Sequence, residues 1–194
     1  MAAYNVADEN GKKMLRALFP DMEWDEVCEG QKNDDRPVTE RIKTFEDACR
    51  ELGDDHPLVN HYNFNFGSES SWVESIYTKD FEAYLKLRII TAALNEGWEP
   101  EFTQDEWRWY PWFTLWTEHE LARKSDEWKQ ERCLQPMTDH KGEWAGLAYA
   151  NSYSTPSDSL THFGSRLCFK SESLAEYAGK QFIDIWMDFE LIRK

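Results

Sequence analysis

The densest group of side chains that could do chemistry lies between residues 95 and 107, in the segment NEGWEPEFTQDEW. It holds five carboxylates and two tryptophans but no lysine or arginine; we single out Glu96, Trp98, Glu99, Glu101, Asp105, Glu106 and Trp107. Such carboxylates could hold a cation or steer a basic protein surface, and tryptophan rings supply contact area. A solvated acidic connection is the more common role of such a segment. Partner binding is therefore a hypothesis for these seven residues.

Elsewhere the sequence lacks the motifs of common catalytic and metal sites. His56 and His61 are five residues apart, which does not place them on one face of a helix. The pattern H-E-x-x-H is missing, although His119 and Glu120 are adjacent, and G-x-S-x-G and phosphate-binding glycine loops are missing as well. The hydroxyl-rich segment 151–162 has no local base and is typical of hydrogen-bonded turns. We predict no catalytic residue, no metal site and no cofactor.

The run WRWYPWFTLW, residues 107–116, is the most aromatic part of the chain. Strand alternation places its side chains on two faces, with Trp107, Trp109, Phe113 and Leu115 on one and Tyr110, Trp112 and Trp116 on the other. Pro111 restricts the strand to a sheet edge or a bend. Exposed rings could stack on sugars or bases or bind a protein. We expect most of them to form a core instead.

Composition limits the class of protein. The 194 residues carry 37 acidic and 22 basic side chains, a net charge of −15 that lies mostly in the first two thirds. Such a chain repels phosphates, so we expect no direct nucleic-acid binding. No apolar run reaches the roughly 18 residues of a membrane span, and the first residues do not resemble a signal peptide. Four widely separated cysteines favour reduced thiols in a cytosolic or virion-internal protein.

The last third predicts two short strands and a closing helix. WAGLAYA and FGSRLCF, residues 144–150 and 163–169, have the pattern of a hairpin around the loop 151–162. A helix then begins at Ser173, which forms a capping box with Glu176. Its apolar stripe consists of Leu174, Ala178, Phe182, Ile185, Trp186 and Phe189. This amphipathic helix should close the fold.

The first half predicts helices. The patterns indicate helices at 8–19, from Thr39 to Gly53, briefly at 56–62, and at 81–97 after Asp80, with an irregular loop at 63–78. Residues 118–128 have helical character, and 132–137 form a short strand. The polar segment 30–37 marks a boundary between a helical segment 1–37 and one domain, 38–194. We predict an α+β fold, with helices packed on a small, mostly antiparallel sheet and closed by the C-terminal amphipathic helix.

Three long segments resemble an uncharacterised family of proteins from bacteriophages and prophages of gut Bacteroides-type bacteria. They begin TERIKTFEDACRELGDDHPLV, AYLKLRIITAALNEGWEPEF and GLAYANSYSTPSDSLTHFGS, and the likeness covers about residues 38–189. It implies a viral protein in the host cytoplasm or the virion and brings no activity with it. Residues 164–167 also resemble the G-x-R-L strand of C-type-lectin-like modules, although a long helix follows here.

Three functions remain open on this basis. The leading hypothesis is a non-enzymatic phage accessory or virion-associated protein that acts through protein contacts. A second is an anti-defence protein whose acidic surface mimics nucleic acid and occupies a basic partner. A third is an aromatic-rich sugar-binding module or an enzyme. The sequence indicates no oligomeric state.

Overall fold

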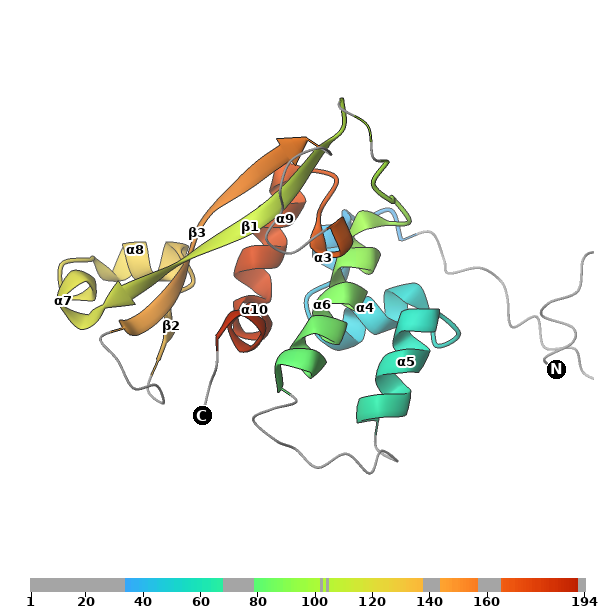
Figure 1. Ribbon diagram of the computed structural model, residues 1–194, viewed down its shortest axis with the longest axis horizontal. Helices are drawn as coiled ribbons and strands as arrows, with labels where there is room; N and C mark the ends of the chain where they lie inside the picture. Colours follow the sequence, from blue (N-terminus) through green and yellow to red (C-terminus); the bar gives the residue numbers. More distant parts are fainter. Residues whose placement is uncertain are drawn as a thin grey trace, which may run out of the picture. The chain divides into compact units, whose positions relative to one another are not determined.

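The computed structural model describes residues 34–67, 79–101, 103, 105–137, 144–156 and 165–191. The chain divides into two units, Met1–Arg36 and Pro37–Lys194. The second unit is α+β, with helices packed around a small antiparallel sheet, which confirms the predicted fold class (Figure 1). The predicted helix at 8–19 lies outside the described residues. Within the described residues, no helix is both long and apolar enough to cross a membrane.

Two short helices replace the single helix predicted from Thr39. They are α3, Val38–Arg41, and α4, Phe45–Leu52. The chain is extended between them, and Thr44 forms the capping box of α4 with Asp47. The prediction was wrong about the cap because Ile42 leaves the helical path and is fully buried. The predicted C-terminal end of the helix is confirmed, because Gly53 follows α4 with φ 85°, which glycine adopts at little cost.

The next two helices form the middle of the domain. Helix α5, Pro57–Phe66, is longer than predicted and takes its last turn from the expected loop. Helix α6, Lys79–Asn95, is buried on most of its circumference, as predicted from a sequence that is apolar on most sides. It packs against α4, α5 and α10, so it is central. The chain leaves α6 through Gly97, at φ 81°.

The sheet is a long two-stranded ribbon with a short third strand. Strand β1, Trp107–Thr117, pairs with β3, Trp144–Pro156, and β2, Gln135–Pro136, lies on the other side of β3. Helices α7, Glu118–Leu121, and α8, Asp126–Glu131, connect β1 to β2 at one end of the ribbon (Figure 1). The register shifts after Trp112, since Phe113 pairs with Tyr149 and Ala150 is left as a bulge. Bulges of this kind increase the local twist.

The predicted hairpin between 144–150 and 163–169 is wrong. Strand β3 continues through the expected loop to Pro156 and pairs with β1. Residues Ser165–Leu167 form a 3₁₀ turn, η1, and Phe169 makes an isolated bridge to Trp109 on the free side of β1. The aromatic strand β1 offers an eleven-residue ladder, which outweighs the local pairing that the sequence suggested.

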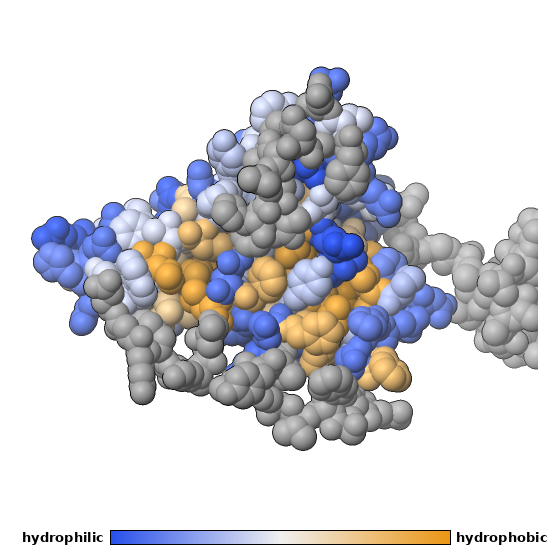
Figure 2. Space-filling model, viewed as in Figure 1, coloured by the Kyte–Doolittle hydropathy of each residue, from blue (hydrophilic) through white to orange (hydrophobic). Residues whose placement is uncertain are grey.

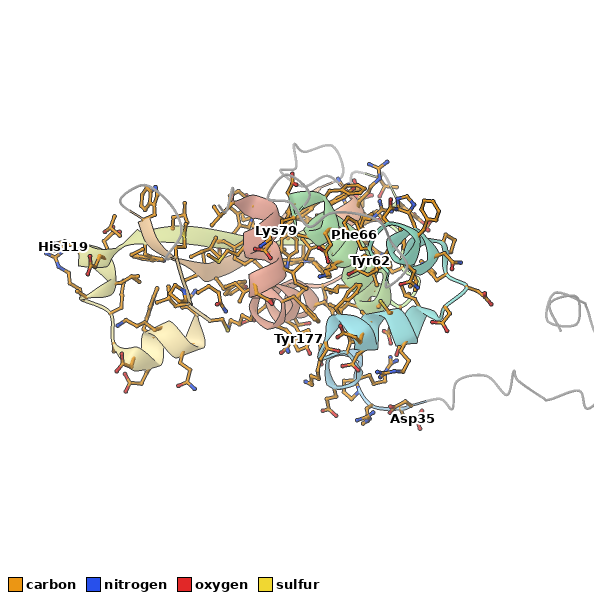
Figure 3. The ribbon with its side chains drawn as sticks, turned by 90° about the horizontal axis from the view of Figure 1, so that it is seen from below. Asp35, Tyr62, Phe66, Lys79, His119 and Tyr177 are labelled. Carbon is orange, nitrogen blue, oxygen red and sulfur yellow. The ribbon has the colours of Figure 1, made fainter. Side chains whose placement is uncertain are left out.

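Two helices close the domain where one was predicted. They are α9, Glu172–Gln181, and α10, Ile183–Glu190, separated by a break at Phe182. Ser171 caps α9 by accepting from the Leu174 amide, so the predicted cap at Ser173 was two residues late. The apolar stripe is confirmed, since it packs in one core with α6. Tyr177 of α9 donates to the Ile42 carbonyl oxygen at 2.6 Å (Figure 3).

Hydrophobic side chains also reach the surface. They gather in the middle of the face in Figure 2, in the region where Figure 1 places α10 and α6. The end that carries α7 and α8 is mostly hydrophilic. Acidic side chains are abundant there, since Glu118, Glu120, Asp126, Glu127 and Glu131 are all exposed.

Candidate functional site

Glu96, the first carboxylate of the predicted site, is tied into the fold. It follows α6 with φ 50° and accepts from Lys170 Nζ at 2.9 Å and from Arg41 Nη2 at 2.6 Å. The Lys170 hydrogen bond and the nearby Arg41 lower the pKa of this carboxyl below its ordinary value. Glu96 therefore joins the end of α6 to α3 and to the segment before α9.

The other carboxylates are more open. Glu99, Glu101 and Asp105 are exposed, while Glu106 is half-buried and accepts from the Glu101 amide at 2.5 Å. Glu99 and Asp105 form no ion pair with any described residue. In the described part of the chain, no three His, Cys, Asp or Glu side chains come together as a metal site. The connection therefore presents unneutralised negative charge.

The two tryptophans of the segment differ. Trp98 is half-buried and lines a cleft, whereas Trp107 is 56% exposed at the start of β1. The seven predicted residues thus divide into one that is tied to the core, two that line a cleft, Trp98 and Glu99, and four at or before the start of β1. Their binding of a partner stays a prediction.

The β1–β3 ribbon has an inner face and an outer face. The predicted alternation along β1 is confirmed in part, since Trp109, Phe113 and Leu115 pack inward against the core. Trp107, predicted on the same face, is 56% exposed, and Tyr110, predicted on the opposite face, is buried. On the outer face, Trp112 is 38% exposed and Tyr153 of β3 is 55% exposed, with their rings edge to face at 6.1 Å. The expected core role therefore holds for the inner face, and the outer face leaves aromatic rings in solvent.

Trp116 continues the outer face but is covered. Its ring lies 5.1 Å from that of Trp128 in α8, and Lys124 Nζ lies 4.5 Å from the ring centroid. The α7–α8 segment therefore covers one end of this face. The exposed part is centred on Trp112 and Tyr153, which we call the outer aromatic pair.

A cleft of about 640 Å³ lies between α5, α6 and η1. Its lining comes from the first turn of α5, the second half of α6, the connection after α6 and the segment around η1. The polar lining residues are His56, Arg88, Thr91, Asn95, Glu99, Ser165 and Arg166. Asn95 fixes one wall, because it donates to the Cys168 carbonyl at 2.8 Å and accepts from the Lys170 amide.

The sequence patterns did not predict this cleft. Arg88 was the available signal, because it is a charged side chain within the otherwise apolar second half of α6. Arg166 was expected on a strand, but it is exposed within the turn η1. The site needs three segments that are far apart in sequence, and no local pattern brings these together.

The three cysteines in the described part of the chain are not arranged as nucleophiles. Cys49, Cys133 and Cys168 are free thiols. Burial raises the pKa of Cys168, which lines the cleft, to about 11, and burial also raises the pKa of Cys49 to about 11. Both are neutral thiols at pH 7, and the thiolate is the reactive form.

Comparisons with known proteins add no family to this geometry. No protein-family model, no curated protein and no solved structure matches the chain.

Proposed function

We propose that this protein is a non-enzymatic binding protein that docks a basic protein surface. The docking surface consists of the outer aromatic pair together with the acidic connection that leads into β1. One observation carries the proposal: Trp112 and Tyr153 expose 38% and 55% of their surface while they contact each other.

The outer aromatic pair has the properties of an interface anchor. Large rings bury much area at a small entropic cost, and Trp and Tyr are enriched among residues that dominate binding energy. Thr114 and Asn151 are also exposed, and Asn151 is the cross-strand partner of Trp112. The strands hold the rings on a paired ladder, so little order has to be gained on binding.

The negative charge of the chain indicates which kind of protein would bind to it. The net charge is −15, and Glu99 and Asp105 have no neutralising partner among the described residues. Charges of one sign near an interface steer a partner of the opposite sign and raise its association rate. A basic protein is therefore the occupant that fits.

The resemblance to a phage and prophage family supports a setting for this activity. We propose a phage accessory or virion-associated protein that meets its basic partner in the host cytoplasm or in the virion. If the partner binds nucleic acid, occupation of its basic groove would make this protein an anti-defence factor. That narrower role is tested by competition between the protein and DNA for the partner.

The test compares three forms of the full chain as bait in infected-cell extract. They are the wild type, Trp112→Ala/Tyr153→Ala, and Glu99→Lys/Glu101→Lys/Asp105→Lys. We expect a basic protein that the wild type captures and that the aromatic variant loses. Once that protein is purified, the charge variant should associate with it at least tenfold more slowly than the wild type does at low salt. Added salt should reduce this difference between the two association rates.

Phe64→Ala is the matched control, because Phe64 is 81% exposed on α5, a different element from the ribbon. It should bind as the wild type does. The proposal fails if every captured protein binds the aromatic variant as tightly as the wild type. Binding of an oligosaccharide that depends on Trp112 and Tyr153 would instead indicate a sugar-binding module.

A further inference from the structure

We propose that the cleft between α5, α6 and η1 binds a small organic phosphate that carries a flat ring, in the class of a nucleoside monophosphate. The cleft shares Trp98 and Glu99 with the acidic connection, but it does not include the outer aromatic pair, and the proposal does not depend on the docking surface. The volume of about 640 Å³ is within the range of small-molecule sites.

Two arginines supply the positive charge. Arg88 of α6 and Arg166 of η1 both line the cleft. Neither forms an ion pair with a described residue, and the one contact of Arg88 is with the Tyr84 ring, 5.9 Å from its guanidinium. Both guanidinium groups are therefore available to an anion in the cleft. A guanidinium fork matches phosphate oxygens in a bidentate arrangement.

His56 at the start of α5 adds a donor. His56 caps this helix, and its Nδ1 accepts from the Leu58 amide at 3.3 Å. With Nδ1 used as the acceptor, the proton of the neutral ring lies on Nε2, which is left as a donor. The positive end of the helix dipole at this turn also favours an anion.

A buried hydroxyl lies in the same lining. Thr91 is 4% exposed, and its Oγ1 has no hydrogen-bond partner among the described residues. A buried hydroxyl without a partner costs free energy, so such a group needs an explanation. A phosphate oxygen of the bound molecule would accept from it. Together, the cleft's hydrogen-bond donors outnumber the hydrogen bonds that a single carboxylate accepts. This favours a phosphate as the bound anion.

The remaining lining suits a ring. Trp98 is half-buried and faces the cleft together with the apolar side chains of Pro57, Leu58, Ala92 and Pro100. An indole can stack on a base. Glu99 is the one carboxylate in the lining, and its negative charge repels an anion. Its removal should therefore strengthen binding of a phosphate and weaken binding of a cation.

The experiment measures binding of AMP, adenosine and inorganic phosphate to the full chain by calorimetry and by the shift in melting temperature. We expect AMP to bind and to raise the melting temperature with concentration, and adenosine to bind at least tenfold more weakly. Arg88→Gln and Arg166→Gln should each weaken AMP binding about tenfold or more, and Glu99→Gln should tighten it. Arg123→Gln is the control, since Arg123 is exposed and does not line the cleft.

Arg166→Gln keeps the test valid if Arg88→Gln fails to fold, because Arg166 is exposed on a surface turn. The proposal is overturned if millimolar AMP does not bind, if adenosine binds as well as AMP, or if Arg166→Gln binds AMP like the wild type. If inorganic phosphate and AMP bind equally well, the cleft does not recognise the ring and is a site for phosphate alone. Failure here says nothing against the docking surface, which is tested with a protein partner.

Discussion

The two faces of the β1–β3 ribbon are built from similar residues and have different surroundings. On the inner face, Phe113 packs against Tyr149 and against Trp186 of α10, and α9 lies directly on the strands. On the outer face, Trp112 and Tyr153 contact each other and remain partly in solvent. Aromatic content alone therefore does not distinguish a core from a binding surface. The difference comes from whether a helix covers the face.

The largest expected effect compares one tryptophan from each region. Trp186→Ala should lower the free energy of unfolding by about 3–5 kcal/mol, because it removes a fully buried ring from the core. Trp112→Ala, the matched change on the outer face, should cost far less. Denaturant unfolding of both variants measures this. Equal losses would mean that the outer ring is as much a part of the core as the inner one.

A second variant tests how closely α9 lies on the inner face. A Cβ on Gly179 would lie 2.7 Å from Pro111 Cβ and 3.0 Å from the Tyr149 ring. Gly179→Ala should therefore cost about 1–3 kcal/mol by overpacking, although alanine is the better helix former. Thr114→Val on the exposed outer face is the control and should leave the melting temperature nearly unchanged. A more stable Gly179→Ala protein would show that α9 sits farther from the strands.

A third variant sharpens the division within the acidic connection. The folded-state pKa of Glu96 is lowered, so its ionised form contributes stability above the ordinary value of 4.5, and this is lost as the pH falls through the lower folded pKa. Glu96→Gln should be less stable than the wild type at pH 7, by at most about 1 kcal/mol because the side chain is 42% exposed. The difference should vanish in acid.

Glu99→Gln is the control for this pH series, since Glu99 has no ion pair with a described residue. Its stability at pH 7 should equal that of the wild type. If Glu96→Gln also follows the wild type, Glu96 belongs with the open carboxylates and not with the packed region.

The smallest expected effect on stability is on the outer face. Trp112→Ala/Tyr153→Ala should change the free energy of unfolding by about 0.5 kcal/mol in total, as is usual for surface positions. Thermal unfolding measures the change, and partner binding should be lost at the same time. A loss close to that of Trp186→Ala would remove the distinction between the faces and with it the docking surface.

Local patterns in the sequence predicted several parts of the fold correctly. The apolar stripe from Leu174 to Phe189, the central role of α6 and the inward positions of Trp109, Phe113 and Leu115 are all present, because each depends on the periodicity of one element. The stop at Gly53 was also predicted, since its positive φ is a local property of glycine. The net charge was likewise available from the sequence, and the proposal of a basic partner rests on it.

The tertiary structure decided how these elements meet. The partner of β3 is β1 and not residues 163–169, because a long ladder across the chain outweighs a local hairpin. Tertiary contacts also separate Glu96 from the open carboxylates of the connection, because they place Arg41 and Lys170 in ion pairs with it. The cleft with Arg88 and Arg166 exists only after α5, α6 and η1 have packed, since its lining spans more than a hundred residues of sequence. Periodicity determines which face of an element is apolar, whereas only packing determines which faces remain open.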